Sequence, residues 1–74
     1  MSLETLDLHR VKHENVEELV SKFFNWSEIP CRVITGNSER MKKIVRKIIT
    51  SYGYSFYYES DFNHGSLIVV EKSR

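Results

Sequence analysis

The chain has 74 residues, of which 41 % are hydrophobic and 12 % aromatic; this composition is typical of one small folded domain and excludes a disordered tail. Its single cysteine excludes an internal disulfide, and no apolar run approaches the roughly 20 residues that a membrane-spanning helix needs. The net charge is only +1, so overall charge favours no class of partner.

The N-terminal segment lacks the basic and apolar regions of a signal peptide. Cys31, at the start of an apolar run, is expected to be a buried thiol in a reducing compartment. We therefore expect a cytoplasmic protein without a membrane partner, folded as one domain over residues 1–74.

The first half of the chain predicts a strand and a helix. Alternating Leu6 and Leu8 predict a strand over residues 4–9. Apolar residues at helical spacing predict a helix over residues 15–25, with this apolar stripe: Val16, Leu19, Val20 and Phe23, widened by Phe24 and Trp26. Asn15 and Glu18 are spaced as a capping box, with His13 and Glu14 as alternative starts of the helix.

The second half predicts a strand, a helix and two further strands. A β-rich segment predicts a strand over residues 31–35, and Asn37 or Ser38 is a suitable N-cap for the helix that follows. That helix has its own apolar stripe: Met41, Ile44, Val45, Ile48, Ile49 and Tyr52. Gly53 ends it, and residues 54–59 and 66–72 predict a hairpin.

The predicted order is therefore βαβαββ, which belongs to the α/β class as a two-layer α+β sandwich. Right-handed crossovers are expected to place both helices on one face of a four-stranded mixed sheet.

The turn after the second strand is a candidate phosphate site. If the strand ends at Thr35, the unpaired N–H groups at the start of the next helix point out of the carboxyl end of the sheet. Gly36 would allow a close backbone approach, and Asn37 and Ser38 have side chains that can donate hydrogen bonds. An ordinary capped helix explains the same residues, and the turn alone favours that interpretation because it has no Walker motif.

Basic residues gather in and around this helix. Residues 29–49 contain six bases and one acid, a local net charge of +5. Arg40, Lys43 and Lys47 are predicted to share a solvated face, flanked by Lys42 and Arg46. Such a face suits a nucleic-acid backbone, although solvated basic helices are common in proteins of other function.

Asp7 and His9 are candidates for acid–base chemistry. They share the polar face of the first predicted strand at its carboxyl end, where ligands bind in open sheets of this kind. Histidine titrates near neutrality, and a carboxylate can orient it. Two polar residues on a half-exposed strand are the plainer interpretation. The chain has no CxxC or HxxxH spacing, so no metal site is predicted, while use of Mg²⁺ or Mn²⁺ in a reaction stays open.

The motifs together resemble the Smr (small MutS-related) domain family. Leu6-Asp7-Leu8-His9 match its LDLHG motif without the glycine, Thr35-Gly36 match its TGxG motif, and Gly65 matches the glycine before its last strand. Met41-Lys42 stand where Leu-Arg is usual. Two family glycines are replaced, by Arg10 and by Ser38. Arg10 either adds a phosphate contact or crowds the approach to His9.

The resemblance implies a stand-alone, divergent Smr-like domain that binds DNA or RNA and acts as an endonuclease, with Asp7 and His9 as catalytic residues. The expected phosphate-binding residues are Arg10, Thr35, Gly36, Asn37, Ser38, Arg40, Lys42, Lys43 and Lys47. A non-catalytic DNA- or RNA-binding module and a small protein-interaction adaptor are the alternatives. The sequence leaves the choice between DNA and RNA open, and the oligomeric state too.

Overall fold

A computed structural model describes residues 3–72 of the chain. Its elements follow the predicted order: β1 (Thr5–Asp7), α1 (His13–Trp26), β2 (Cys31–Ile34), α2 (Glu39–Ser51), β3 (Tyr54–Tyr58) and β4 (Ser66–Glu71). β1 begins one residue later and ends two residues earlier than predicted, and each of the other three strands ends one residue earlier, which is the usual uncertainty of element ends. None of the helices in this part of the chain is long and apolar enough to cross a membrane.

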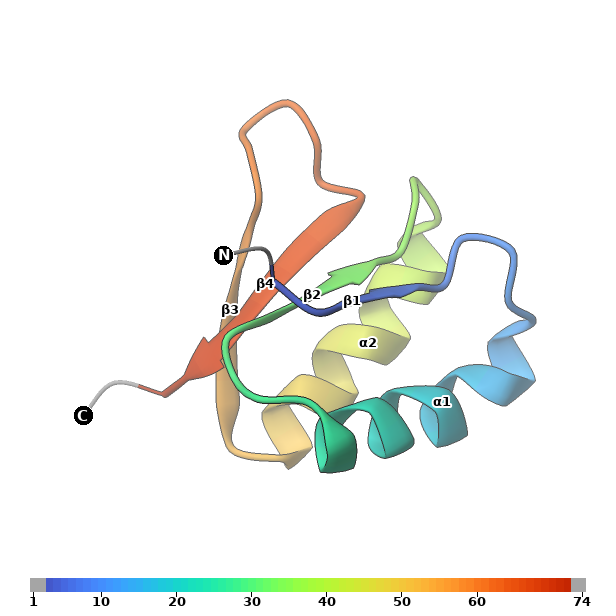
Figure 1. The fold of residues 1–74 in the computed structure, drawn as a ribbon. Helices are drawn as coiled ribbons and strands as arrows, with labels where there is room; N and C mark the ends of the chain where they lie inside the picture. The colour runs from blue at the N-terminus through green and yellow to red at the C-terminus, as the bar shows by residue number, and fades with distance from the viewer. Residues whose placement is uncertain (1–2, 73–74) are drawn as a thin grey trace.

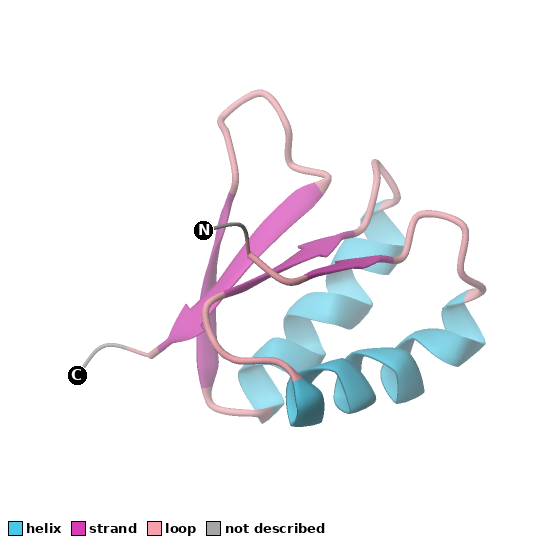
Figure 2. Ribbon diagram, viewed as in Figure 1, coloured by secondary structure: helices cyan, strands magenta, loops and turns pink. Residues whose placement is uncertain are grey.

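The four strands form one mixed sheet in the order β1-β2-β4-β3, with both helices on one of its faces (Figures 1 and 2). β1 is parallel to β2, whereas β4 is antiparallel to both β2 and β3. The predicted α/β layout and the β3–β4 hairpin are therefore confirmed. The last strand inserts between β2 and β3, so the sheet's open face brings together residues from all four strands.

The core lies between the sheet and the helices. Alternate strand residues point into it, and α1 contributes one residue per turn, at positions four apart. The fully or almost fully buried core residues are Leu8, Val16, Val20, Phe24, Cys31, Val33, Met41, Val45, Ile48, Ile49, Leu67 and Val69. Phe24 also packs edge-on against Tyr52 and Tyr54, with ring centroids 5.2 and 5.5 Å away.

α1 differs from its prediction at both ends. The helix begins at His13, one of its two alternative predicted starts, with Lys12 as the N-cap and no side-chain capping bond. The backbone N–H of Asn15 donates to the Lys12 carbonyl, so the capping box at Asn15 was wrong. Trp26 is 87 % exposed. It lies two residues beyond Phe24, roughly 200° round the helix, and therefore faces away from the core.

α2 begins as predicted at a capped N-terminus. The Ser38 hydroxyl accepts a hydrogen bond from the backbone N–H of Met41 at 3.1 Å. The helix ends at Tyr52, the C-cap residue, and Gly53 follows with φ +78°, the left-handed conformation expected after a helix end. The predicted start and end of this helix are confirmed.

Candidate functional site

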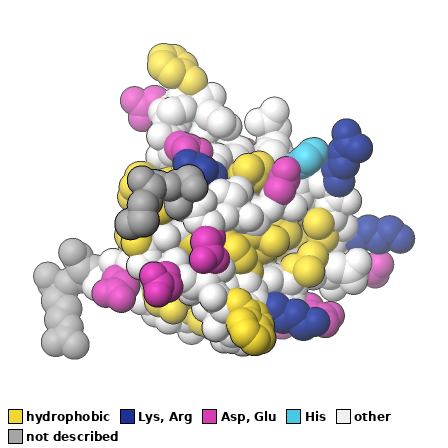
Figure 3. Space-filling model, in the orientation of Figure 1, with side chains coloured by type: hydrophobic (Ala, Val, Ile, Leu, Met, Phe, Trp, Pro, Cys, Tyr) yellow, Lys and Arg dark blue, Asp and Glu magenta, His cyan; other side chains and the backbone are white. Residues whose placement is uncertain are grey.

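Asp7 and His9 form a side-chain pair at the carboxyl end of β1. The His9 Nδ1 lies 2.5 Å from Asp7 Oδ1, and the backbone N–H of His9 donates to the same oxygen at 3.1 Å. Both side chains are about half exposed. On the face drawn in Figure 3, a histidine lies between an acidic and a basic side chain. The pair is thus fixed by the backbone and open to solvent.

The hydrogen bonds assign a tautomer to His9. Because the Asp7 carboxylate only accepts, His9 Nδ1 is the protonated donor and Nε2 is the acceptor. Arg10 Nε donates to that Nε2 at 3.2 Å. The hydrogen bonds from the His9 side chain and then its backbone N–H lower the pKa of Asp7. Asp7 therefore stays ionised, and the hydrogen bond from Arg10 engages His9 Nε2, the nitrogen that would accept a proton.

The turn between β2 and α2 lies directly against His9. Gly36 has φ +71°, and a Cβ added there would be 3.3 Å from the His9 Cβ. On its other side, a Cβ added at Gly65 would be 3.0 Å from the Gly36 carbonyl. The β1–α1, β2–α2 and β3–β4 loops therefore converge at one end of the sheet, as Figure 1 shows. The expected convergence of His9 and the turn is present in the structure.

Two parts of this turn have structural tasks. The backbone N–H groups of Thr35 and Gly36 donate to the Gly65 carbonyl at 2.7 and 3.1 Å. The Thr35 side chain is buried, and its hydroxyl lies 3.0 Å from the Gly36 carbonyl. Ser38 caps Met41, so the helix-start N–H groups of Ser38, Glu39 and Arg40 are those left for a ligand. Thr35 holds the turn and is not presented to solvent, unlike the exposed Asn37 and Ser38.

The basic residues of α2 differ in their exposure to solvent. Arg40, Lys43 and Lys47 are exposed, as expected of a solvated basic face. Lys42 is only 7 % exposed, with its Nζ 3.5 Å from Glu39 Oε1, so the expectation that it flanks that face was wrong. Its side chain lies on the buried side of α2 next to Met41, and its long apolar stem makes this burial tolerable.

The open face of the sheet carries a polar network that the sequence did not predict. Arg32 donates through Nη2 to Glu59 Oε2 at 2.7 Å and through Nη1 to Thr5 Oγ1 at 3.3 Å. The Ser66 hydroxyl donates to Glu59 Oε1 at 2.6 Å. Arg32 between buried Cys31 and Val33 signalled an open-face position. The partners of Arg32 could be recognised only from the strand order, in which β4 lies between β2 and β3.

This network borders a pocket of about 480 Å³, here called the open-face pocket. Its lining includes Arg32, Ile34, Asn37, Glu59, Asn63 and Ser66. Asp7, Ile34 and Ser66 are register partners in one row across the sheet, and the backbone N–H of Glu59 bonds to the Ser66 carbonyl. The open-face pocket therefore adjoins both the Asp7–His9 pair and the turn.

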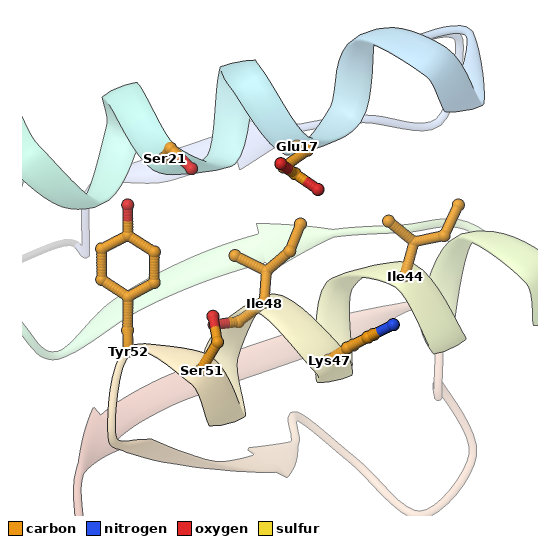
Figure 4. Close-up of a pocket in the computed structure, with 7 residues that line it drawn as sticks. All are labelled: Glu17, Ser21, Ile44, Lys47, Ile48, Ser51 and Tyr52. Atoms are coloured by element: carbon orange, nitrogen blue, oxygen red, sulfur yellow. The ribbon is translucent and has the colours of Figure 1, made fainter.

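A second hollow, of about 470 Å³, lies between the two helices, on the side away from the sheet. Figure 4 shows Ile48 and Tyr52 pointing from α2 toward α1, where Glu17 and Ser21 face them. Lys47 borders this groove, so the basic face of α2 extends from the turn to the groove between the helices.

No group of three or more His, Cys, Asp or Glu side chains that could hold a metal ion occurs among residues 3–72. Asp7 and His9 by themselves offer two protein ligands, fewer than the three or four of a typical protein zinc site.

In comparisons with protein-family models, with curated proteins and with solved structures, the chain shows no significant match.

Proposed function

We propose that this chain is a nucleic-acid-binding domain that hydrolyses phosphodiester bonds at the carboxyl end of β1. The observation that carries the proposal is the placement of the Asp7–His9 pair against Gly36, at the N-terminus of α2. This arrangement puts an imidazole, which can accept or donate a proton, beside a backbone site suited to an anion. The motifs that resemble the Smr family and the βαβαββ order support it.

The phosphate site in this proposal consists of backbone N–H groups and the residues around them. A phosphate would accept hydrogen bonds from the N–H groups of Glu39 and Arg40, aided by the helix dipole and the Asn37 side chain. Lys43 and Lys47 would bind neighbouring phosphates along α2. Thr35 and Lys42 have no part in binding here because their side chains are buried.

The proposed chemistry uses His9 Nε2 as the proton acceptor. In the neutral ring, Asp7 accepts the hydrogen bond from Nδ1–H, which leaves Nε2 as the nitrogen without a proton. Nε2 takes a proton from the attacking water, the oxygen attacks phosphorus, and the bond from phosphorus to the leaving oxygen breaks. The ring then returns the proton to that leaving oxygen. Arg10 must leave Nε2 for this to occur, and its guanidinium then serves the phosphate as a charge-assisted donor.

The cleavage test is a panel of supercoiled plasmid and structured RNA, each with and without Mg²⁺ or Mn²⁺. We expect the wild type to cut at least one substrate and His9→Ala to bind but not cut. If the wild type cuts neither substrate under any of these conditions, the enzymatic half of the proposal fails.

Salt dependence tests the binding half. We expect the affinity for single-stranded oligonucleotides to fall steeply with salt, and the log–log slope to decrease in magnitude by about one in Lys43→Gln. Lys22→Gln is the matched control, because Lys22 is an exposed lysine on α1 that pairs with Glu18 at 3.0 Å. Equal slopes in all three proteins would remove α2 from the interface.

A second function, binding without cleavage, is favoured by one contact. Arg10 stands where the Smr motif has glycine, and its Nε donates a hydrogen bond to His9 Nε2 at 3.2 Å. If this contact persists in the complex, the domain binds a strand in the cytoplasm and leaves it intact. Arg10→Gly then gains cleavage that the wild type lacks, whereas a protein-interaction adaptor shows no salt-dependent binding at all.

A further inference from the structure

We infer that the open-face pocket binds an unpaired guanine base of the strand whose phosphate lies on the neighbouring turn. The inference deepens the proposed nucleic-acid binding and rests on it. It is carried by the hydrogen-bonding pattern that Glu59 and Asn63 present to the pocket, and by the position of the pocket beside the turn.

Glu59 offers two acceptor positions in a fixed orientation. Each carboxylate oxygen can accept about two hydrogen bonds, and each already accepts one, Oε1 from Ser66 and Oε2 from Arg32. One position on each oxygen remains. The two bonds also lower the pKa of Glu59, the Ser66 hydroxyl more than Arg32, so the group is an acceptor only. It is therefore prepared for a partner with two adjacent donors.

Asn63 adds a donor to the same pocket. Its Oδ1 accepts a hydrogen bond from the backbone N–H of Gly65 at 3.0 Å, which fixes the orientation of the amide. The amide nitrogen is then the end that remains to donate. Glu59 and Asn63 together present two acceptors and one donor.

Guanine is the base whose Watson–Crick edge has the complementary set. Its N2–H and N1–H are adjacent donors, and O6 beside them is an acceptor. Adenine and cytosine have one donor group next to an acceptor, and uracil has a single N–H between two carbonyls, so none of these fills both positions on Glu59. Unpaired bases in single strands are the ones whose Watson–Crick edges proteins can read in this way.

Charge and shape favour a neutral base over a cationic side chain. Arg32 already pairs with Glu59 at 2.7 Å, so the pocket has little attraction left for a second cation. Ile34 supplies an apolar surface for a planar ring, and a volume of about 480 Å³ lies within the range of small-ligand pockets. Asn37 borders both pocket and turn, so one nucleotide can occupy the two together.

The test compares labelled eight-nucleotide RNA probes in the wild-type protein: a uridine tract, and the same tract with one central guanosine, inosine or adenosine. We expect guanosine to bind about tenfold or more tightly than adenosine or the plain tract, the discrimination typical of one good two-bond base contact. Inosine lacks the N2 amine and should lie between them. Free GMP should compete only weakly, since it lacks the neighbouring phosphates that α2 would bind.

Glu59→Gln should abolish the guanosine preference while still binding the uridine tract, because an amide replaces one acceptor with a donor. Glu71→Gln, an exposed residue at the far end of β4, is the matched control and should keep the preference. Equal binding of guanosine, inosine and adenosine probes would overturn this inference and leave the proposed function standing. GMP binding as tightly as the probe would overturn the assignment to a strand, and no salt-dependent binding of any probe would overturn both proposals.

Discussion

Gly36 is the residue at which the backbone of the turn and the proposed catalytic pair depend on one another. Its φ of +71° is one that only glycine adopts at little cost, and the space for a Cβ is limited by His9 at 3.3 Å. The strand-to-helix turn predicted a glycine here that lets the backbone approach a phosphate closely. The structure shows a second, local reason, since the glycine also leaves room for the histidine.

Replacing this glycine should therefore affect both stability and binding. Gly36→Ala is expected to lower the free energy of unfolding by about 1–2 kcal/mol, the cost of a left-handed residue with a side chain, and to weaken oligonucleotide binding because His9 must shift. Gly53→Ala is the matched control. It has φ +78° with no atom within 4 Å of the added Cβ, so it should lose similar stability and keep its affinity. Urea unfolding and fluorescence anisotropy measure the two quantities, and equal affinities in both variants would contradict the role of the Gly36–His9 contact.

The ionisation of Asp7 gives a second prediction for a single residue. The His9 side chain, followed by its backbone N–H, lowers the pKa of this carboxyl below the ordinary 3.8. The folded state therefore binds the proton less readily than the unfolded state. Any stability from the pair is complete above about pH 3.8 and is lost as the pH falls through the lower folded value.

NMR titration of the Asp7 carboxyl carbon measures this directly. We expect a pKa below 3.8 in the wild type and a rise toward that value in His9→Ala. The same pKa in both proteins would show that the pair does not form in solution.

Among the elements, α2 was the most predictable, and its N-terminus combines a cap with the proposed anion site. Both its apolar stripe and its Ser38 cap are local features of the sequence. The apolar residues recur with the 3.6-residue period of a helix, and serine is a favoured N-cap. The end details of α1 were not predictable in the same way. Several polar residues near its start compete as caps, and Lys12 occupies the position without making a side-chain bond.

Two substitutions of Ser38 separate capping from phosphate binding. Ser38→Ala removes the acceptor for Met41 N–H and should cost about 1 kcal/mol of stability. Ser38→Asp keeps a good cap and should preserve stability, yet its negative charge should weaken oligonucleotide binding. Thermal unfolding and anisotropy would report these effects. If Ser38→Asp binds as well as the wild type, the helix start is not where the phosphate lies.

For the whole molecule, the sequence predicted the layers and the presence of a hairpin, but not which strand would lie next to β2. Local periodicity determines the elements, whereas the insertion of β4 between β2 and β3 depends on pairing between distant segments. This is why a short motif was enough to name Asp7 and His9 as candidates, while the Arg32–Glu59–Ser66 network could not be predicted. The unexpected burial of Lys42 has a similar origin, because helical spacing does not specify how far a helix is rotated toward its sheet.

The charges of the chain are also separated along its sequence. Residues 1–28 carry a net charge of −3, and residues 29–49 carry +5. On the proposed interface, the exposed bases of α2 begin at the turn beside His9, so a bound strand would pass from the turn along α2. We therefore predict that the phosphate contact begins at the turn before α2 and is not spread over the surface.

Amide chemical-shift mapping by NMR locates the phosphate contact on the protein. A single-stranded oligonucleotide is titrated at low salt into isotope-labelled protein, with Lys43→Gln as a weakened comparison. We predict that the largest changes occur at His9 and over residues 36–40, and that they need more ligand in the variant. Changes confined to the outer face of α1 around Lys22, or none at these positions at saturating ligand, would contradict the account.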